Sequence, residues 1–328
     1  MTRRASRALI ALALAATLLA SPSSARSDEP PRVAVVSQQA ARLTLVDPAA
    51  GRVVGEVALD KVPAGIAVTR DGRTAYVTHP DLGQVSRVDL NARTVTARYK
   101  IGREPFGIAL DSRETSFLVT DWSDDALIRV DAATGAELGR VTVGRSPAGL
   151  VLDQDGAHAY VADRESHTVS VVDLTAMRRV ATWPTGTAPF ALALSPDGHR
   201  LYVANVRSNN LSVLEIPGGR EIARPRVGLM PYGVAVSSDG ARVIVTNQQS
   251  GKLAWLEAGT GAVQSEVRIG EYPEGVLNIG GGLFAVALWA DDALCIVPDL
   301  PGSGCRSVIK IPPGPRLLAI APRQTGSQ

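Results

Sequence analysis

Short apolar or alternating runs, separated by polar turns, make up the chain from residue 33 onwards. In residues 147–188 these runs cover 149–152, 159–162, 169–172 and 180–183, and the pair Asp155-Gly156 lies between the first two. Asp-Gly favours the positive φ angles of a tight hairpin turn. No stretch has the apolar period of a helix, so the pattern predicts units of four short antiparallel strands.

The same unit recurs every 42 residues without an insertion, and each repeat carries a proline at Pro63, Pro105, Pro147, Pro189, Pro231, Pro273 and Pro315. A period near 40 residues with four strands per unit is typical of a propeller blade. Residues 33–62 match the last thirty residues of a unit and lack its first strand, whereas residues 315–322 match 63–70. We therefore predict an all-β fold, a seven-bladed β-propeller of four-stranded blades, whose C-terminal strand closes the ring by joining the N-terminal blade.

An acidic residue ends the third strand of every unit, at Asp47, Asp89, Asp131, Asp173, Glu215, Glu257 and Asp299. Carboxylates at turns accept hydrogen bonds from nearby backbone amides. We expect these acids to cap turns rather than to form a functional ring.

The motifs YVTH at 76–79, YVAD at 160–163 and YVAN at 202–205 end the second strands. With SPDG at 195–198 they resemble the YVTN-repeat β-propeller family, of the YncE-like exported seven-bladed type, over essentially the whole chain after residue 32. The resemblance implies an exported binding or accessory protein, although a fold by itself does not determine a function.

Residues 1–25 have the form of a secretory signal peptide, because Arg3, Arg4 and Arg7 precede the apolar run 8–20 and small residues follow at 23–25. We divide the chain into a signal peptide at 1–25, a short linker at 26–32, the propeller at 33–323 and a C-terminal tail at 324–328. The predicted location is periplasmic or secreted, by the general route in preference to the twin-arginine route. We expect a monomer without a membrane anchor.

The charge balance changes when the signal peptide is removed, because three of the 34 basic residues and none of the 32 acidic ones lie in residues 1–25. The mature chain is then almost neutral, and its arginines are scattered. This composition argues against nucleic acid as a partner. An unknown periplasmic protein or a small polar ligand is the expected partner.

The position after each repeat proline varies in size and charge, and it lies where an inner strand begins at one mouth of the central channel. The second strands end at the same mouth. From these positions and the loops beside them we predict a ligand site formed by Phe106, Phe190, Tyr232, Glu274, Arg316, His79, Asp121, Trp122, Asp163, Arg207 and Trp289. Substitutions there are expected to change stability little. The alternative is that Asn and Asp at second-strand ends bond loop backbone, which we favour for Asn205 and Asn247.

Cys295 in the third strand and Cys305 at the start of the fourth strand of the last unit face each other across a predicted hairpin. In an exported protein this arrangement favours a disulfide over two reduced thiols.

Catalytic patterns are sparse. None of the four histidines forms a pair at metal-ligand spacing, and we predict no metal site and no cofactor. A non-catalytic ligand-binding, protein-interaction or accessory module is the favoured function. A hydrolase or lyase of the lactonase or streptogramin-lyase type stays open, with His79 as an acid–base group or with oxygen ligands for calcium. A third interpretation, by analogy with the family, is an accessory to a periplasmic quinone or haem oxidoreductase.

Overall fold

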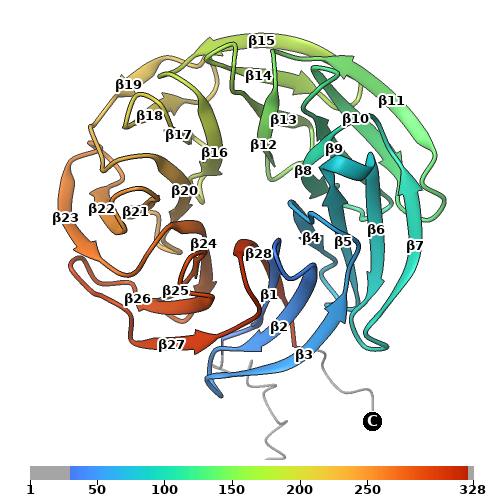
Figure 1. Cartoon of the computed structure of the whole chain (residues 1–328). Helices are drawn as coiled ribbons and strands as arrows, with labels where there is room; N and C mark the ends of the chain where they lie inside the picture. The colour runs from blue at the N-terminus through green and yellow to red at the C-terminus, as the bar shows by residue number, and fades with distance from the viewer. Residues whose placement is uncertain (1–29, 324–328) are drawn as a thin grey trace, which may run out of the picture.

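The computed structural model describes residues 30–323, which form seven four-stranded antiparallel sheets arranged in a ring (Figure 1). The predicted seven-bladed propeller is therefore confirmed. Residues 1–29 and 324–328 lie outside the described residues. The predicted signal peptide, the first four residues of the linker and the C-terminal tail fall in these segments.

Each blade contributes one strand to each of four concentric positions. The inner strands are β4 (Ile66–Val68), β8 (Pro105–Leu110), β12 (Pro147–Leu152), β16 (Pro189–Leu194), β20 (Pro231–Val236), β24 (Pro273–Gly280) and β28 (Pro315–Ala321). The second strands are β1 (Arg32–Ser37), β5 (Thr74–His79), β9 (Ser116–Asp121), β13 (His158–Asp163), β17 (Arg200–Asn205), β21 (Arg242–Asn247) and β25 (Leu283–Leu288).

The third strands are β2 (Arg42–Asp47), β6 (Gln84–Asp89), β10 (Ala126–Asp131), β14 (Thr168–Asp173), β18 (Asn210–Glu215), β22 (Lys252–Glu257) and β26 (Ala293–Pro298). The outer strands are β3 (Arg52–Ala58), β7 (Thr94–Lys100), β11 (Glu137–Thr142), β15 (Arg178–Pro184), β19 (Glu221–Ala223), β23 (Val263–Arg268) and β27 (Ser307–Lys310). One 3₁₀ turn, η1 (Pro80–Leu82), follows β5.

Burial explains why the second and third strands have nearly continuous apolar runs. A middle strand such as β13 is buried at five of its six positions, because its two faces pack against neighbouring blades. The outer strand β15 is instead exposed at most positions and buries Trp183. The core thus lies between blades; for example, Leu118 and Leu127 of one blade pack with Val161 and Val172 of the next.

The two ends of the chain share one blade. β28 pairs with β1 in antiparallel register, with Val33 opposite Ile320 and Val35 opposite Leu318. This sheet has the order β28-β1-β2-β3, so the last strand of the chain becomes the inner strand of the blade that begins the chain (Figure 1). The predicted closure is confirmed.

The acids that end the third strands follow the expectation in most blades. Asp89, Asp131 and Asp173 accept hydrogen bonds from the backbone amides two and three residues further on, at 2.8–3.1 Å. Asp299 differs, because it forms an ion pair with Arg242 at 2.7 Å.

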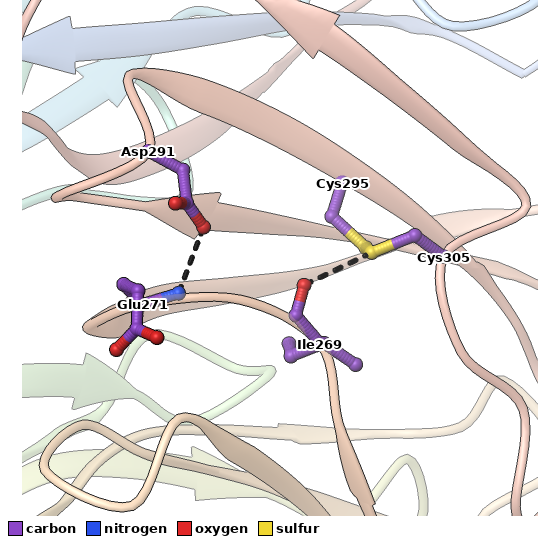
Figure 2. Close-up of a disulfide and its surroundings, with 5 residues drawn as sticks. All are labelled: Ile269, Glu271, Asp291, Cys295 and Cys305. Atoms are coloured by element: carbon purple, nitrogen blue, oxygen red, sulfur yellow. Dashed lines mark hydrogen bonds between the residues drawn. A yellow bond between two sulfur atoms is a disulfide. The ribbon is translucent and has the colours of Figure 1, made fainter.

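A disulfide joins Cys295 of β26 to Cys305, which lies just before β27, with the two Cα atoms 5.4 Å apart (Figure 2). Cys305 Sγ also lies 3.5 Å from the carbonyl oxygen of Ile269, a residue of the preceding blade connection (Figure 2). The bond therefore holds the four-residue outer strand β27 against its blade.

Candidate functional site at the channel mouth

The inner strands begin where the second strands end. Pro147 pairs with Asp163, Pro189 with Asn205 and Pro231 with Asn247. The residue after each proline consequently lies at one end of the central channel.

Four aromatic side chains form a row at this mouth. Ring centroids are 5.5 Å apart for Trp122 and Phe106, 5.6 Å for Phe106 and Phe190, and 4.3 Å for Phe190 and Tyr232. Tilted and edge contacts at such distances are favourable for aromatic pairs. Phe190 and Tyr232 are buried, whereas Phe106 and Trp122 keep part of their surface exposed.

Arg316 completes the row with its guanidinium group, which lies 5.8 Å from the Phe106 ring centre and 5.7 Å from that of Tyr232. Its Nε and Nη2 donate hydrogen bonds to the Tyr232 hydroxyl. Nε also lies 3.1 Å from Glu274 Oε2, as an ion pair rather than an aligned hydrogen bond. Gln248 donates to the other carboxylate oxygen, Glu274 Oε1, at 2.6 Å.

Burial controls the ionisation of this group of side chains. It raises the pKa of Glu274 and that of Tyr232 above their ordinary values, because both charged forms lose hydration. Burial alone would lower the pKa of Arg316, but the Tyr232 and Glu274 side chains outweigh that effect and raise it. The arginine therefore keeps its charge, and the Tyr232 hydroxyl keeps its proton.

Two hollows border the aromatic row. A pocket of about 180 Å³ lies on the mouth side, lined by Trp122, Arg316, Asp81, Glu104 and part of Phe106. A cavity of about 440 Å³ lies along the channel, lined by Phe106, Phe190, Tyr232 and apolar inner-strand residues such as Leu192 and Val234. Phe106 lines both spaces, so the aromatic row lies between them.

Substitutions at the mouth are expected from the sequence to change stability little, and for Arg316 this expectation is wrong. Glu274 is 4% exposed and has Arg316 as its ion-pair partner. Removing one member of a buried ion pair leaves the other charge without compensation, which typically costs about 3–5 kcal/mol. The side chains at this mouth therefore pack against one another and do not simply face an open channel.

Three of the predicted residues are fully buried and offer no surface to a ligand. His79 lies with Nδ1 3.1 Å from the Lys61 carbonyl and Nε2 2.9 Å from Ser86 Oγ, and burial lowers its pKa. Asp121 accepts hydrogen bonds from four backbone amides, those of residues 103, 104, 123 and 124.

Asp163 accepts hydrogen bonds from the Gly144 amide and from the hydroxyls of Thr168 and Ser170, at 2.7–2.9 Å. Gly144 is required at this point, because an added Cβ would lie 2.5 Å from the Asp163 side chain. Asp121 and Asp163 thus bond the loops beside them. The sequence favours this role for Asn205 and Asn247, and for these two the expectation is wrong, because neither bonds loop backbone within residues 30–323. Asn205 donates to Asn210 and Ser212, while the Asn247 amide has no hydrogen bond among the described residues.

The two remaining predicted residues are not members of the aromatic row, although Arg207 is linked to it: its partner Glu165 also pairs with Arg164, whose guanidinium group lies 5.5 Å from the Trp122 ring centre. Arg207 is half exposed and pairs with Glu165 at 2.9 Å. Trp289 packs on Tyr272, with ring centroids 6.1 Å apart.

Sequence reasoning missed Glu104 and Asp81 as lining residues. Glu104 is the residue before a repeat proline, and this position also varies along the chain, as Val62, Ser146 and Tyr272 show. Variation at the position before the proline could therefore have identified Glu104 as a lining residue. Asp81 belongs to η1 and occupies the repeat position that holds Arg207 three units further on, so the reasoning that selected Arg207 applies to Asp81 as well.

Residues 30–323 contain neither a candidate metal-binding cluster nor a candidate membrane-spanning helix. No group of three or more His, Cys, Asp or Glu side chains there could hold a metal ion. Within the same residues, no helix has the length and apolar character needed to cross a membrane.

Several solved structures have a similar fold. Hydrazine synthase from Kuenenia stuttgartiensis has a TM-score of 0.70 at 20% identity, over 78% of this chain and 88% of that one. A periplasmic gluconolactonase from Pseudomonas aeruginosa has 0.74 at 18%, over 88% and 98%. A protein described as functionally unknown, from Desulfotomaculum acetoxidans, has 0.75 at 14%, over 88% and 98%. At such identities the likeness shows the fold alone.

No curated protein matches this chain in sequence. The family model of the YNCE-like beta-propeller matches residues 53–236, which is more than half of the 328 residues. The match includes the four residues of the aromatic row, and it agrees with the resemblance seen in the repeat motifs. The chain therefore belongs to the YNCE-like beta-propeller family.

Proposed function

We propose that the mature protein is an exported, non-catalytic binding module that holds a small planar molecule in the pocket at the channel mouth. The observation that carries the proposal is the pocket lined by Phe106, Trp122 and Arg316, in which both aromatic side chains keep part of their surface exposed. Guanidinium groups lie over the two rings, that of Arg316 5.8 Å from the Phe106 centre and that of Arg164 5.5 Å from the Trp122 centre. Aromatic faces and a planar guanidinium both favour stacking on a flat ligand.

The hydrogen-bonding capacity of Arg316 narrows the ligand further. Nε and Nη2 are engaged with Tyr232 and Glu274, whereas Nη1 has no partner within residues 30–323. A carbonyl or similar acceptor oxygen would satisfy Nη1. Asp81 and Glu104 line the same pocket, and their charges disfavour a multiply charged anion. A flat molecule with a neutral acceptor oxygen fits these groups best.

The lyase alternative draws less support from the site. His79, the histidine assigned to acid–base chemistry, is buried and has both ring nitrogens within hydrogen-bond distance of protein groups. It would need to leave those contacts to reach a substrate.

Native mass spectrometry of protein purified gently from the periplasm of an expression host tests the proposal. Trp122→Ala should lose most of any copurified molecule, because Trp122 is at the exposed end of the row, and should lower the melting temperature no more than Trp289→Ala does. Trp289→Ala is the matched control, since it removes an aromatic residue that does not line the pocket. Retention of the molecule by Trp122→Ala, or its loss from both variants alike, would place binding elsewhere.

A further inference from the structure

A second cavity, of about 530 Å³, lies between two neighbouring blades on the face opposite the mouth. It opens between the blade of β12–β15 and the blade of β16–β19, which are adjacent in the ring (Figure 1). The turn β12–β13, the turn β16–β17 and the turn β18–β19 surround it. Its size is in the range of small-molecule sites.

The floor of this cavity is a packed aromatic pair, Tyr160 and Trp183, with ring centroids 5.5 Å apart. Tyr160 is only 4% exposed. Its hydroxyl has no hydrogen-bond partner within residues 30–323 and is not among the buried polar atoms there, so it is accessible from the cavity that Tyr160 lines.

The other tyrosines at this repeat position behave differently. Tyr76 donates to the carbonyl of Ala132 and Tyr202 to that of Ala258, each at 3.0 Å and each 56 residues further on. The residue 56 positions after Tyr160 is Ile216. It lines the cavity, and its carbonyl is not hydrogen-bonded to the Tyr160 hydroxyl. Tyr76 and Tyr202 thus use their hydroxyls to bond the following blade. The Tyr160 hydroxyl makes no such bond and is available to a ligand.

The charged side chains around the cavity are mostly acidic. Asp153, Asp155 and Asp197 line it together with His158 and His199, and no Lys or Arg is among its lining residues. Asp153 is paired with His158 at 3.0 Å, and Asp197 accepts the His199 amide. Arg200 lines a neighbouring hollow and not this cavity. The field inside the cavity thus favours a cation.

We propose that this cavity binds a small free organic ammonium ion with a flat apolar body. The apolar body packs on Tyr160 and Trp183, the ammonium group lies near the carboxylates, and the Tyr160 hydroxyl accepts one of its hydrogens. This site is separate from the mouth pocket, and either can be present without the other.

Titrations of 4-fluorophenethylamine, followed by ¹⁹F NMR line broadening, test this site, with 4-fluorophenethyl alcohol and 4-fluorophenylpropionate as neutral and anionic analogues. The amine should bind about ten-fold more tightly than the alcohol, and the acid should not bind. Tyr160→Phe and Asp155→Asn should each weaken amine binding by about ten-fold, the effect of one charge-assisted hydrogen bond or one nearby charge.

Tyr202→Phe is the matched control, because it removes the same hydroxyl one blade further on, where it is hydrogen-bonded within the protein. It should lower the melting temperature and leave amine binding unchanged, whereas Tyr160→Phe should leave the melting temperature unchanged. Trp122→Ala at the mouth should not affect amine binding.

Equal affinity for the amine and the alcohol, no binding at millimolar concentration, or affinity that survives Tyr160→Phe and Asp155→Asn would overturn the proposal. Equal affinity for the peptide Gly-Lys-Gly would overturn the assignment to free amines.

Discussion

Asp163 is fully buried at a repeat position that the two following blades fill with Asn205 and Asn247. Burial raises its pKa to about 6, although the hydroxyls of Ser170 and Thr168 and the Gly144 amide favour the charged form. An asparagine at the same position bonds the equivalent serine without carrying a charge, as Asn205 does with Ser212 at 3.0 Å. The loop therefore needs a polar side chain at Asp163 but does not need its negative charge.

The first prediction concerns the pH dependence of stability. In the unfolded chain Asp163 titrates near pH 3.8, and in the folded protein near pH 6, so the folded state binds the proton more tightly. The stability gained from this tighter proton binding is fully present below about pH 4 and is lost as the pH rises from about 4 to about 6. Asp163→Asn should therefore raise the free energy of unfolding at pH 8 by about 1–3 kcal/mol, measured by denaturant unfolding.

The difference between wild type and Asp163→Asn should shrink as the pH falls from 7 to 4. Asp121→Asn is the control, because Asp121 accepts four backbone amides and its carboxylate stabilises that loop. That variant should lose stability at pH 8. A constant difference between wild type and Asp163→Asn over pH 4–8 would contradict the titration of this carboxyl group.

Side-chain packing at the mouth shows what the sequence could not predict. The repeat correctly placed Phe106, Phe190, Tyr232 and Arg316 at one end of the channel, because strand register follows from the spacing. It could not show that these side chains meet across the axis, since residues 84 positions apart come together only when the ring has formed. His79 was misplaced because the side chain of a second-strand end can turn either toward the mouth or into the loop beneath it.

At the scale of single strands, β27 is one of the weakest elements of the fold. It has four residues and pairs with β26 from Ser307 to Lys310, whereas most outer strands have six or seven. Val308 is 54% exposed, so little apolar burial holds the strand in place. The Cys295–Cys305 bond ties the start of β27 to the buried strand β26 (Figure 2).

The second prediction is that protein exported to an oxidising compartment carries this disulfide. Intact mass and thiol labelling under denaturing conditions should find no free thiol. Reduction, or the double substitution Cys295→Ala with Cys305→Ala, should lower stability by about 2–3 kcal/mol, the chain-entropy effect of a loop of this length. Reducing agent should not change the melting temperature of the double variant further. Two free thiols in freshly exported protein would refute the prediction.

At the scale of the whole molecule, the ring depends on a strand contributed by the end of the chain. β28 contributes Leu317, Ala319 and Ala321 to one interblade core and Leu318 to the next. It also carries Arg316, which joins the closing blade to Glu274 of the neighbouring blade and to Tyr232 beyond it. Sequence spacing alone predicted this closure, because the missing first strand at one end and the extra strand at the other had the same pattern.

The third prediction is that deleting residues 315–328 opens the ring. The deletion leaves β1 without a partner on its inner side and exposes apolar side chains of two interblade cores, so the protein should aggregate. Its melting temperature should fall by at least about 10 °C, since several kcal/mol of packing are lost in a chain of this size.

Two controls separate the causes: deletion of residues 324–328 alone should have no effect, and Arg316→Ala in the full chain should show only the cost of the lost ion pair. A synthetic peptide of residues 315–323, added during refolding, should restore solubility by pairing with β1. If the truncated protein melts at the wild-type temperature and stays monodisperse in size-exclusion chromatography, the shared blade is not what holds the propeller closed.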